Sequence, residues 1–142
     1  MDFDGVLLDL LAAGYGVRFQ ARGKSMAPSI RDGEAVTVVP VKPEAVRRWD
    51  VILYSTVFGA AAHRVVGGGH GAPFQVRGDA SGSEPETVEA SRLLGTVVSV
   101  ERNGRRVPFG TPGARLRHAI LRLGNAAAEA VRPLVFSQPV AR

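Results

Sequence analysis

The 142-residue chain contains no cysteine, which excludes disulfides, zinc-thiolate sites and thiol nucleophiles. It also has no apolar run near the roughly 20 residues that a membrane-spanning helix needs. Asp9 interrupts the N-terminal run "VLLDLLAAG", and charged residues such as Arg122 and Arg132 interrupt the run over 119–136. We therefore expect no signal peptide and no transmembrane helix, and a cytoplasmic protein.

Lysine and histidine are scarce. The net charge is +5, which by itself is compatible with a nucleic-acid or anionic-membrane surface. However, Lys24 and Lys42 are the only lysines, and the arginines are scattered along the chain. No recognition-helix pattern or aromatic-basic stacking platform is present. We expect no nucleic-acid partner, and the sequence suggests no cofactor and no metal.

The 17 glycines and 9 prolines indicate many turns and few long helices. Helical spacing of apolar residues predicts a short helix over 4–14, capped by Asp4 and ended by Gly14. Period-two alternation and turn residues predict a mainly β domain over 15–109. Its expected strands cover 15–23, 34–41, a hairpin of 50–56 and 61–66 across "VFGA", 74–78, and two strands within 93–109 around "RNGR".

Three other segments complete the expected organisation. "GGGHGAP" at 67–73 is interpreted as a flexible loop, and 79–92 as a polar loop. Residues 111–136 are helical by pattern, so the domains are an N-terminal helix (1–14), the β domain (15–109) and a C-terminal helical extension (110–142). The basic C-terminal helix is expected to dock on the β domain, with a membrane surface as the alternative.

The stretch "GKSMAPSIRDGE" at 23–34 raises the question of chemistry, because a serine hydroxyl needs a base to become a nucleophile. Lys24 is adjacent to Ser25 and points to the opposite face of an extended chain, and Lys42 lies in a solvated turn. His118 lies among arginines, and His70 lies in the glycine-rich loop. This leaves His63, on a predicted strand, as the candidate base.

A histidine base also needs a group that orients it. Asp79 follows a strand in "VRGDAS", Asp50 lies in "WDVILY", and Asp32 lies in "IRDGE". Each of the three has a local explanation as a turn residue. Spacing alone leaves the choice among them open.

Read in order, "GKSMAPSIRDGE", "WDVILY", "AHRVV" and "VRGDAS" resemble the motifs of the signal peptidase I family and, more distantly, the LexA-type self-cleaving repressors of the same fold. The resemblance covers about residues 17–102. Ser25, Met26 and Pro28 match the nucleophile motif. His63 stands where bacterial members have lysine, as in the archaeal and endoplasmic-reticulum branch.

This resemblance implies a β-barrel-like peptidase domain and a serine endopeptidase that cleaves an extended peptide or protein substrate after small residues. By the same resemblance, Ser25 is the nucleophile, His63 the base and Asp79 the orienting acid. Met26 and Pro28 would line the substrate site. Backbone N–H groups of Ser25 and Gly23 would form the oxyanion hole.

The chain departs from the family pattern by having Ala80 where the family has asparagine, and we expect no N-terminal membrane anchor. Two alternatives therefore stay open. One is a catalytically inactive peptide-binding module on the same fold. The other is a self-cleaving regulator of the LexA type, for which Ala13-Gly14 is the candidate scissile bond.

Overall fold

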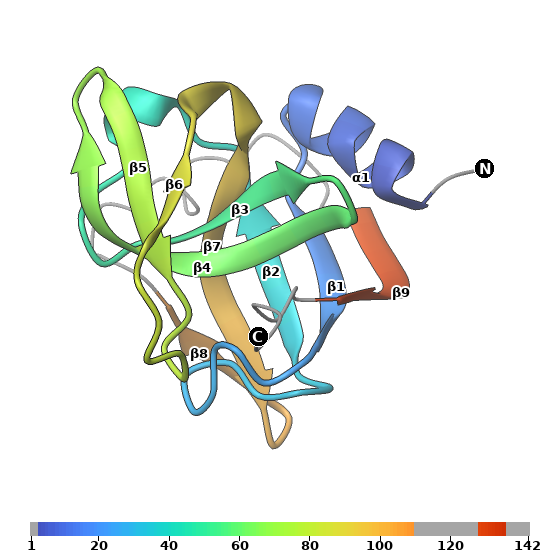
Figure 1. Ribbon diagram of the computed structural model, residues 1–142. Coiled ribbons are helices and arrows are strands. Elements are labelled where there is room, and N and C mark those ends of the chain that lie inside the picture. Colours follow the sequence, from blue (N-terminus) through green and yellow to red (C-terminus); the bar gives the residue numbers. More distant parts are fainter. Residues whose placement is uncertain (1–2, 110–127, 136–142) are drawn as a thin grey trace.

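The computed structural model describes residues 3–109 and 128–135 (Figure 1). The described part is mainly β, as the sequence predicts. It has one α-helix, two 3-10 turns and nine strands. In chain order these are α1 (Phe3–Ala12), β1 (Val17–Arg22), β2 (Ala35–Val39), η1 (Pro43–Ala45), β3 (Val51–Thr56), β4 (Gly59–Gly69), β5 (Ala72–Arg77), β6 (Glu86–Val88), η2 (Ala90–Arg92), β7 (Leu93–Arg102), β8 (Arg105–Pro108) and β9 (Ala128–Val135).

Helix α1 confirms the predicted N-terminal helix. Leu7 and Leu11 are buried on one face, one turn apart, which is the spacing that lets a helix cover a sheet. The helix ends where the Tyr15 N–H donates to the Leu10 carbonyl at 2.9 Å. Gly14 has a φ of 93° and supplies the left-handed residue that this kind of helix end requires.

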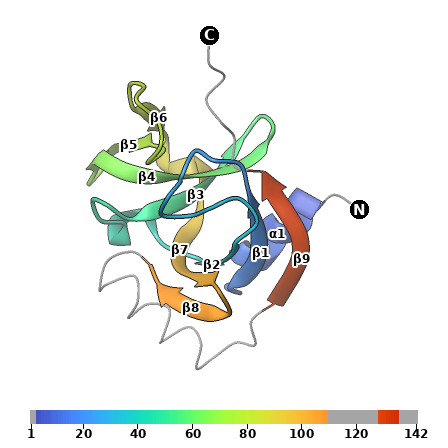
Figure 2. The ribbon, with the colours of Figure 1, turned by 90° about the horizontal axis from the view of Figure 1, so that it is seen from below.

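The strands form one sheet in the order β6-β5-β4-β3-β7-β2-β1-β9, with β8 paired to β7. All pairs are antiparallel except β1 with β9. The sheet is strongly curved in the two views (Figures 1 and 2) but does not close into a barrel. The expected barrel-like closure is therefore not seen, since β6 and β9 end the strand order without pairing to each other.

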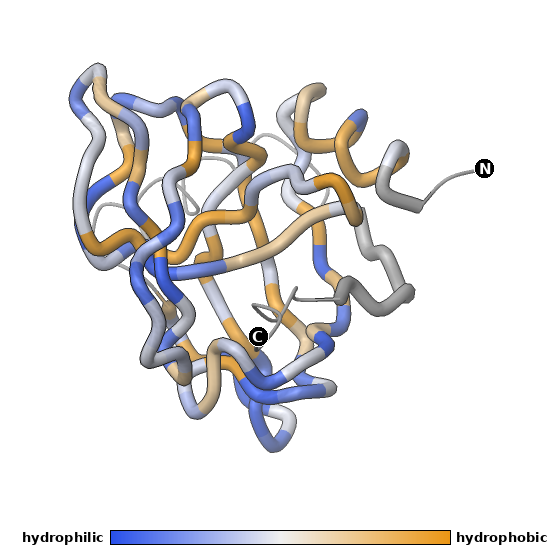
Figure 3. The backbone as a smooth tube through the Cα atoms, viewed as in Figure 1, coloured by the Kyte–Doolittle hydropathy of each residue, from blue (hydrophilic) through white to orange (hydrophobic). Residues whose placement is uncertain are grey.

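The two larger apolar clusters of the described residues lie on either side of β3, which contributes side chains to both. Val51 and Leu53 pack into the main core with α1, β1 and β2. Ile52 and Tyr54 point to the other face and pack with β5 and β6 in a second core. A strand buried on both faces has a continuous apolar sequence rather than an alternating one, and Figure 3 shows the apolar positions following the strands.

Both predicted hairpins are confirmed. In the β3–β4 hairpin, Ile52 lies opposite His63 and Tyr54 lies opposite Ala61. In the β7–β8 hairpin, Asn103 and Gly104 have φ values of 53° and 73°. These left-handed values are those of the tight turn that an Asn-Gly pair favours.

The glycine-rich run at 67–73 is not the flexible loop that its composition suggests. Strand β4 continues through Gly69, and the chain turns at His70 and Gly71 into β5. A Cβ on Gly68 would lie 2.0 Å from the Pro73 carbonyl oxygen. Glycine is needed here because the two backbones approach closely at an irregular point of the ladder.

The polar segment 79–92 also differs from expectation. It contains strand β6, which pairs with β5, and the short turn η2. Val88 is fully buried in the second core and anchors the strand. Three residues are too few for periodicity to reveal a strand, which is why the pattern favoured a loop.

The expected C-terminal helix is wrong for residues 128–135. They form β9, which pairs in parallel with β1, and Pro133 lies opposite Gln20. Proline disrupts a helix interior but fits a strand at the edge of a sheet, which is where β9 lies. The rest of the predicted helix lies outside the described residues. Within the described ranges no helix is long and apolar enough to cross a membrane.

Candidate active site

Ser25 lies in the β1–β2 loop, residues 23–34, and its hydroxyl contacts His63 on β4. Met26 and Ile30 are fully buried in the main core, and the Ile30 N–H donates to the Met26 carbonyl at 2.9 Å. Burial of these two side chains fixes the position of a loop that is otherwise polar. Ser25 itself is only 6% exposed.

Charged side chains tie both ends of this loop. The Gly23 N–H donates to the Asp32 carboxylate at 2.9 Å. Arg102 on β7 donates to both carboxylate oxygens of Glu34, at 2.7 and 2.8 Å, and also to the carbonyls of Pro28 and Ser29. The hydrogen bonds from Arg102 hold the pKa of Glu34 below its ordinary value, against the opposing effect of burial.

The segment Gly78-Asp79-Ala80 clamps the loop from the other side. The Ala80 N–H donates to the Ser25 carbonyl at 2.9 Å, and the Asp79 N–H lies 3.4 Å from the Met26 sulfur. A Cβ on Gly78 would lie 2.5 Å from the Ser25 carbonyl oxygen. This position therefore needs glycine for space, because the two backbones touch.

The Asp79 carboxylate completes this clamp. It accepts hydrogen bonds from Nε and Nη2 of Arg64, at 2.7 and 2.8 Å, and from the Ser29 hydroxyl at 2.6 Å. Burial acts to raise the pKa of Asp79, but the hydrogen bonds from Arg64 and Ser29 outweigh it and the pKa is lowered. Arg64 and Asp79 thus form an ion pair.

Asp79 is consequently not placed as the acid that orients His63. Within the described part of the chain, its hydrogen bonds go to Arg64, Ser29 and Met26 and none goes to the imidazole. Of the other two candidates, Asp32 is bonded to Gly23, and the Oδ2 of Asp50 accepts the Arg47 N–H at 2.8 Å. Of these bonds, that of Asp50 lies within its own turn, whereas the Asp32 and Asp79 carboxylates bond to residues more distant in the sequence.

The structure does bring Ser25 and His63 together. The Nε2 of His63 lies 3.3 Å from the Ser25 hydroxyl oxygen, across 38 residues of sequence. His63 is 5% exposed and is held on β4, so both groups are shielded and positioned. An imidazole nitrogen at this distance can take the hydroxyl proton with little movement.

The other nitrogen of His63 faces a residue that sequence reasoning missed. Its Nδ1 lies 2.8 Å from the Tyr54 hydroxyl, and that hydroxyl donates to Glu86 Oε2 at 3.0 Å. Residues opposite each other in a hairpin share a face, and His63 lies opposite Ile52, two positions from Tyr54. The predicted hairpin therefore contained a signal for Tyr54. Glu86 carried none, because it was expected in a loop.

Burial is the largest influence on the pKa values of His63 and Tyr54. It lowers the pKa of His63, although the negative charges of Glu86 and Asp79 act to raise it. Burial and then the charge of Glu86 raise the pKa of Tyr54. Both side chains are thus favoured in their neutral forms at neutral pH.

The remaining predicted site residues differ in their exposure and contacts. Met26 is fully buried and takes the Asp79 N–H on its sulfur, so it supports the loop and does not line an open groove. Pro28 is exposed on the loop. The Gly23 N–H is occupied by Asp32 and cannot serve an oxyanion. The Ser25 N–H, in contrast, has no acceptor among the described residues.

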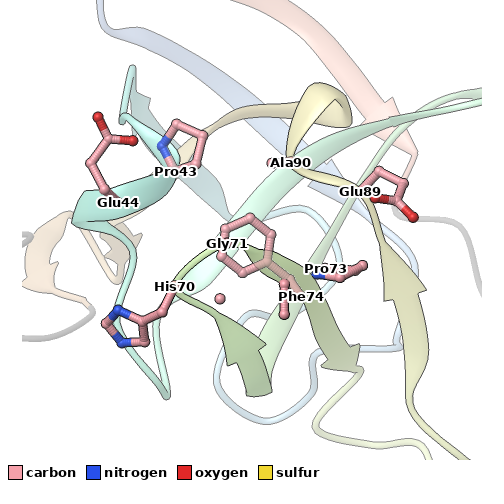
Figure 4. A pocket seen from close by; sticks show the side chains of 10 residues that line it. Pro43, Glu44, His70, Gly71, Pro73, Phe74, Glu89 and Ala90 are labelled. Carbon is pink, nitrogen blue, oxygen red and sulfur yellow. The ribbon is translucent and has the colours of Figure 1, made fainter.

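Among the described residues, no other candidate base bonds to the Ser25 hydroxyl. Lys24 and Lys42 are exposed, and His118 lies outside the described residues. His70 borders a pocket of about 220 Å³ between the β4–β5 turn, η1 and the start of η2 (Figure 4). Figure 4 shows its imidazole directed to one side, away from Phe74 and Glu89. This pocket contains neither Ser25 nor His63.

In the described ranges no three side chains of His, Asp or Glu are grouped to hold a metal ion. Comparisons with protein-family models, curated proteins and solved structures find no match to this chain.

Proposed function

We propose that this chain is a serine endopeptidase of the signal-peptidase type, with Ser25 as nucleophile and His63 as general base. The observation that carries the proposal is the 3.3 Å approach of His63 Nε2 to Ser25 Oγ in a shielded site. The ordered motifs of the sequence support the same class. The expected substrate is an extended peptide with small residues before the cleaved bond.

The reaction has two stages, acylation of Ser25 and hydrolysis of the acyl-enzyme. Ser25 Oγ bonds to the peptide carbonyl carbon while its proton passes to His63 Nε2, and the carbonyl oxygen becomes an oxyanion. The C–N bond then breaks, and Nε2 returns the proton to the leaving amine. Water repeats the sequence on the acyl-enzyme, releasing the acid and regenerating Ser25.

In this proposal the Ser25 N–H, which has no acceptor among the described residues, would donate to the oxyanion. Because Ser25 is tied through its own carbonyl to Ala80 and through Met26 to the core, this N–H is held in place before substrate arrives. A fixed donor of this kind stabilises developing charge without reorganisation.

The test uses two probes on the full chain. Purified protein is incubated with a fluorophosphonate and with a pool of internally quenched peptides carrying alanine before the scissile bond. Wild type is compared with Ser25→Ala and His63→Ala, and with Lys24→Ala as the matched control. Circular dichroism confirms that each variant is folded.

We expect labelling and cleavage in wild type and in Lys24→Ala, and neither in the Ser25 and His63 variants. Cleavage that persists in Ser25→Ala would rule out the assignment. A folded wild type that binds the peptides without cleaving them or reacting would instead indicate the inactive peptide-binding module.

A further inference from the structure

We propose that Tyr54 and Glu86 orient His63 as a positioning pair, holding the imidazole with its proton on Nδ1 and its Nε2 lone pair toward Ser25. The role in catalysis rests on the proposed function of Ser25 and His63. The arrangement itself can be tested without any activity.

The donors and acceptors of Glu86 and Tyr54 determine which nitrogen of His63 carries the hydrogen. The Glu86 carboxylate only accepts hydrogen bonds, and the Tyr54 hydroxyl has a single proton to donate. That proton goes to Glu86 Oε2, at 3.0 Å. The hydroxyl oxygen is then left as the acceptor at 2.8 Å from His63 Nδ1, so Nδ1 carries the hydrogen.

The consequence lies on the opposite edge of the ring. A neutral imidazole with hydrogen on Nδ1 has a free lone pair on Nε2. Nε2 is the atom that lies 3.3 Å from Ser25 Oγ. The chain Glu86–Tyr54–His63–Ser25 therefore presents the base in the form that can accept the serine proton.

Neighbouring contacts fix the pair. Tyr54 is fully buried on β3. Arg92 lies 3.7 Å from the second Glu86 oxygen, donates to the Ser55 carbonyl at 2.9 Å, and places its guanidinium 5.4 Å from the Tyr54 ring centre. Arg92 thus contacts both members of the pair, Tyr54 on β3 and Glu86 on β6.

Charged groups reach His63 from several elements. Glu86 lies on β6 and Asp79 follows β5, and both negative charges favour the imidazolium. Arg64 is next to His63 on β4 but is paired with Asp79, and Arg92 in η2 is next to Glu86. Removing the charge of Glu86 should therefore lower the pKa of His63 further.

The decisive measurement is nitrogen NMR of the full chain, labelled with ¹⁵N-histidine, at pH 7.5. The His63 signals are assigned by their loss in His63→Gln. In wild type we expect the pattern of a ring protonated at Nδ1. In Tyr54→Phe, which keeps the ring and removes the acceptor, we expect the proton to move toward Nε2. Tyr15→Phe is the matched control, because Tyr15 is an exposed tyrosine.

Two further readouts separate positioning from simple support of the fold. The His63 titration, followed by NMR, should move to lower pH in Glu86→Gln and stay unchanged in Glu84→Gln, an exposed carboxylate two residues away. The rate of fluorophosphonate labelling should fall on the order of 10- to 100-fold in Tyr54→Phe, by analogy with the loss of the hydrogen-bond partner that orients a metal-bound histidine.

A folded wild type with the His63 proton on Nε2 overturns the proposal. So does a Tyr54→Phe variant that folds and retains both the wild-type tautomer and the labelling rate. If Tyr54→Phe does not fold, the position of the His63 proton in wild type decides the proposal alone. Absence of labelling in every protein would remove the peptidase assignment, while the tautomer would still report on the Tyr54–Glu86 pair.

Discussion

Replacing Gly78 with alanine tests the contact between the Gly78-Asp79-Ala80 segment and the serine loop. The added Cβ would lie 2.5 Å from the Ser25 carbonyl oxygen and 3.3 Å from the Ser25 Cβ. Ordinary carbon–oxygen contacts are about 3.3 Å or longer, so one backbone must move by about 0.8 Å. Gly78 has no left-handed φ, so the effect comes from space alone.

We expect a loss of stability and a larger loss of reactivity. Overpacking of a tightly packed site costs about 1–3 kcal/mol in the free energy of unfolding. For a domain of this size that corresponds to roughly 3–12 °C in the midpoint of thermal unfolding. The same movement disturbs the 3.3 Å Ser25–His63 approach, and a displacement near 1 Å can slow a reaction on the order of 100-fold.

Gly82→Ala is the matched control, because a Cβ there would meet nothing within 4 Å and the residue is exposed. Thermal unfolding by circular dichroism and the rate of fluorophosphonate labelling are measured for both variants. If Gly78→Ala unfolds at the same temperature as Gly82→Ala, the close approach of the two backbones is absent and the reasoning is refuted. A destabilised variant that labels at the wild-type rate would show that the contact does not position Ser25.

Two other predictions follow from burial. Met26→Ala should lower the free energy of unfolding by about 2–5 kcal/mol, as for other buried methionines, measured by urea denaturation; a change below about 0.5 kcal/mol would restore Met26 as a surface residue of the substrate site. Because the folded pKa of His63 lies below the ordinary value of about 6.5, the unfolded chain binds the proton first as pH falls, so wild-type stability should decrease below about pH 6.5. His63→Gln should reduce that dependence, and identical pH profiles for the two proteins would contradict the depressed pKa.

Local patterns predicted much of the fold. The alternation of Val17, Phe19 and Ala21 gave strand β1, and Gly14 marked the end of α1. The "RNGR" turn gave the last hairpin, because Asn-Gly accepts two left-handed residues in a row. These features depend on neighbours within a few residues, which the sequence displays directly.

Predictions failed where the deciding contact was distant. The glycine run at 67–73 proved to be strand and tight turn, since its glycines allow the backbone of β4 to approach β5. Residues 128–135 proved to be a strand because β1 has an edge that they can pair with. Neither partner is visible from the local composition.

The same division holds for the candidate site. The sequence by itself marked Ser25 as a candidate nucleophile in need of a base and His63 as the histidine expected on a strand. Only the tertiary structure brought the two within 3.3 Å, assigned Asp79 to Arg64, and placed Tyr54 and Glu86 on the far side of the imidazole. The physical reason is that residue type and strand position are local properties, whereas a hydrogen-bond partner is chosen by whichever groups the fold buries side by side.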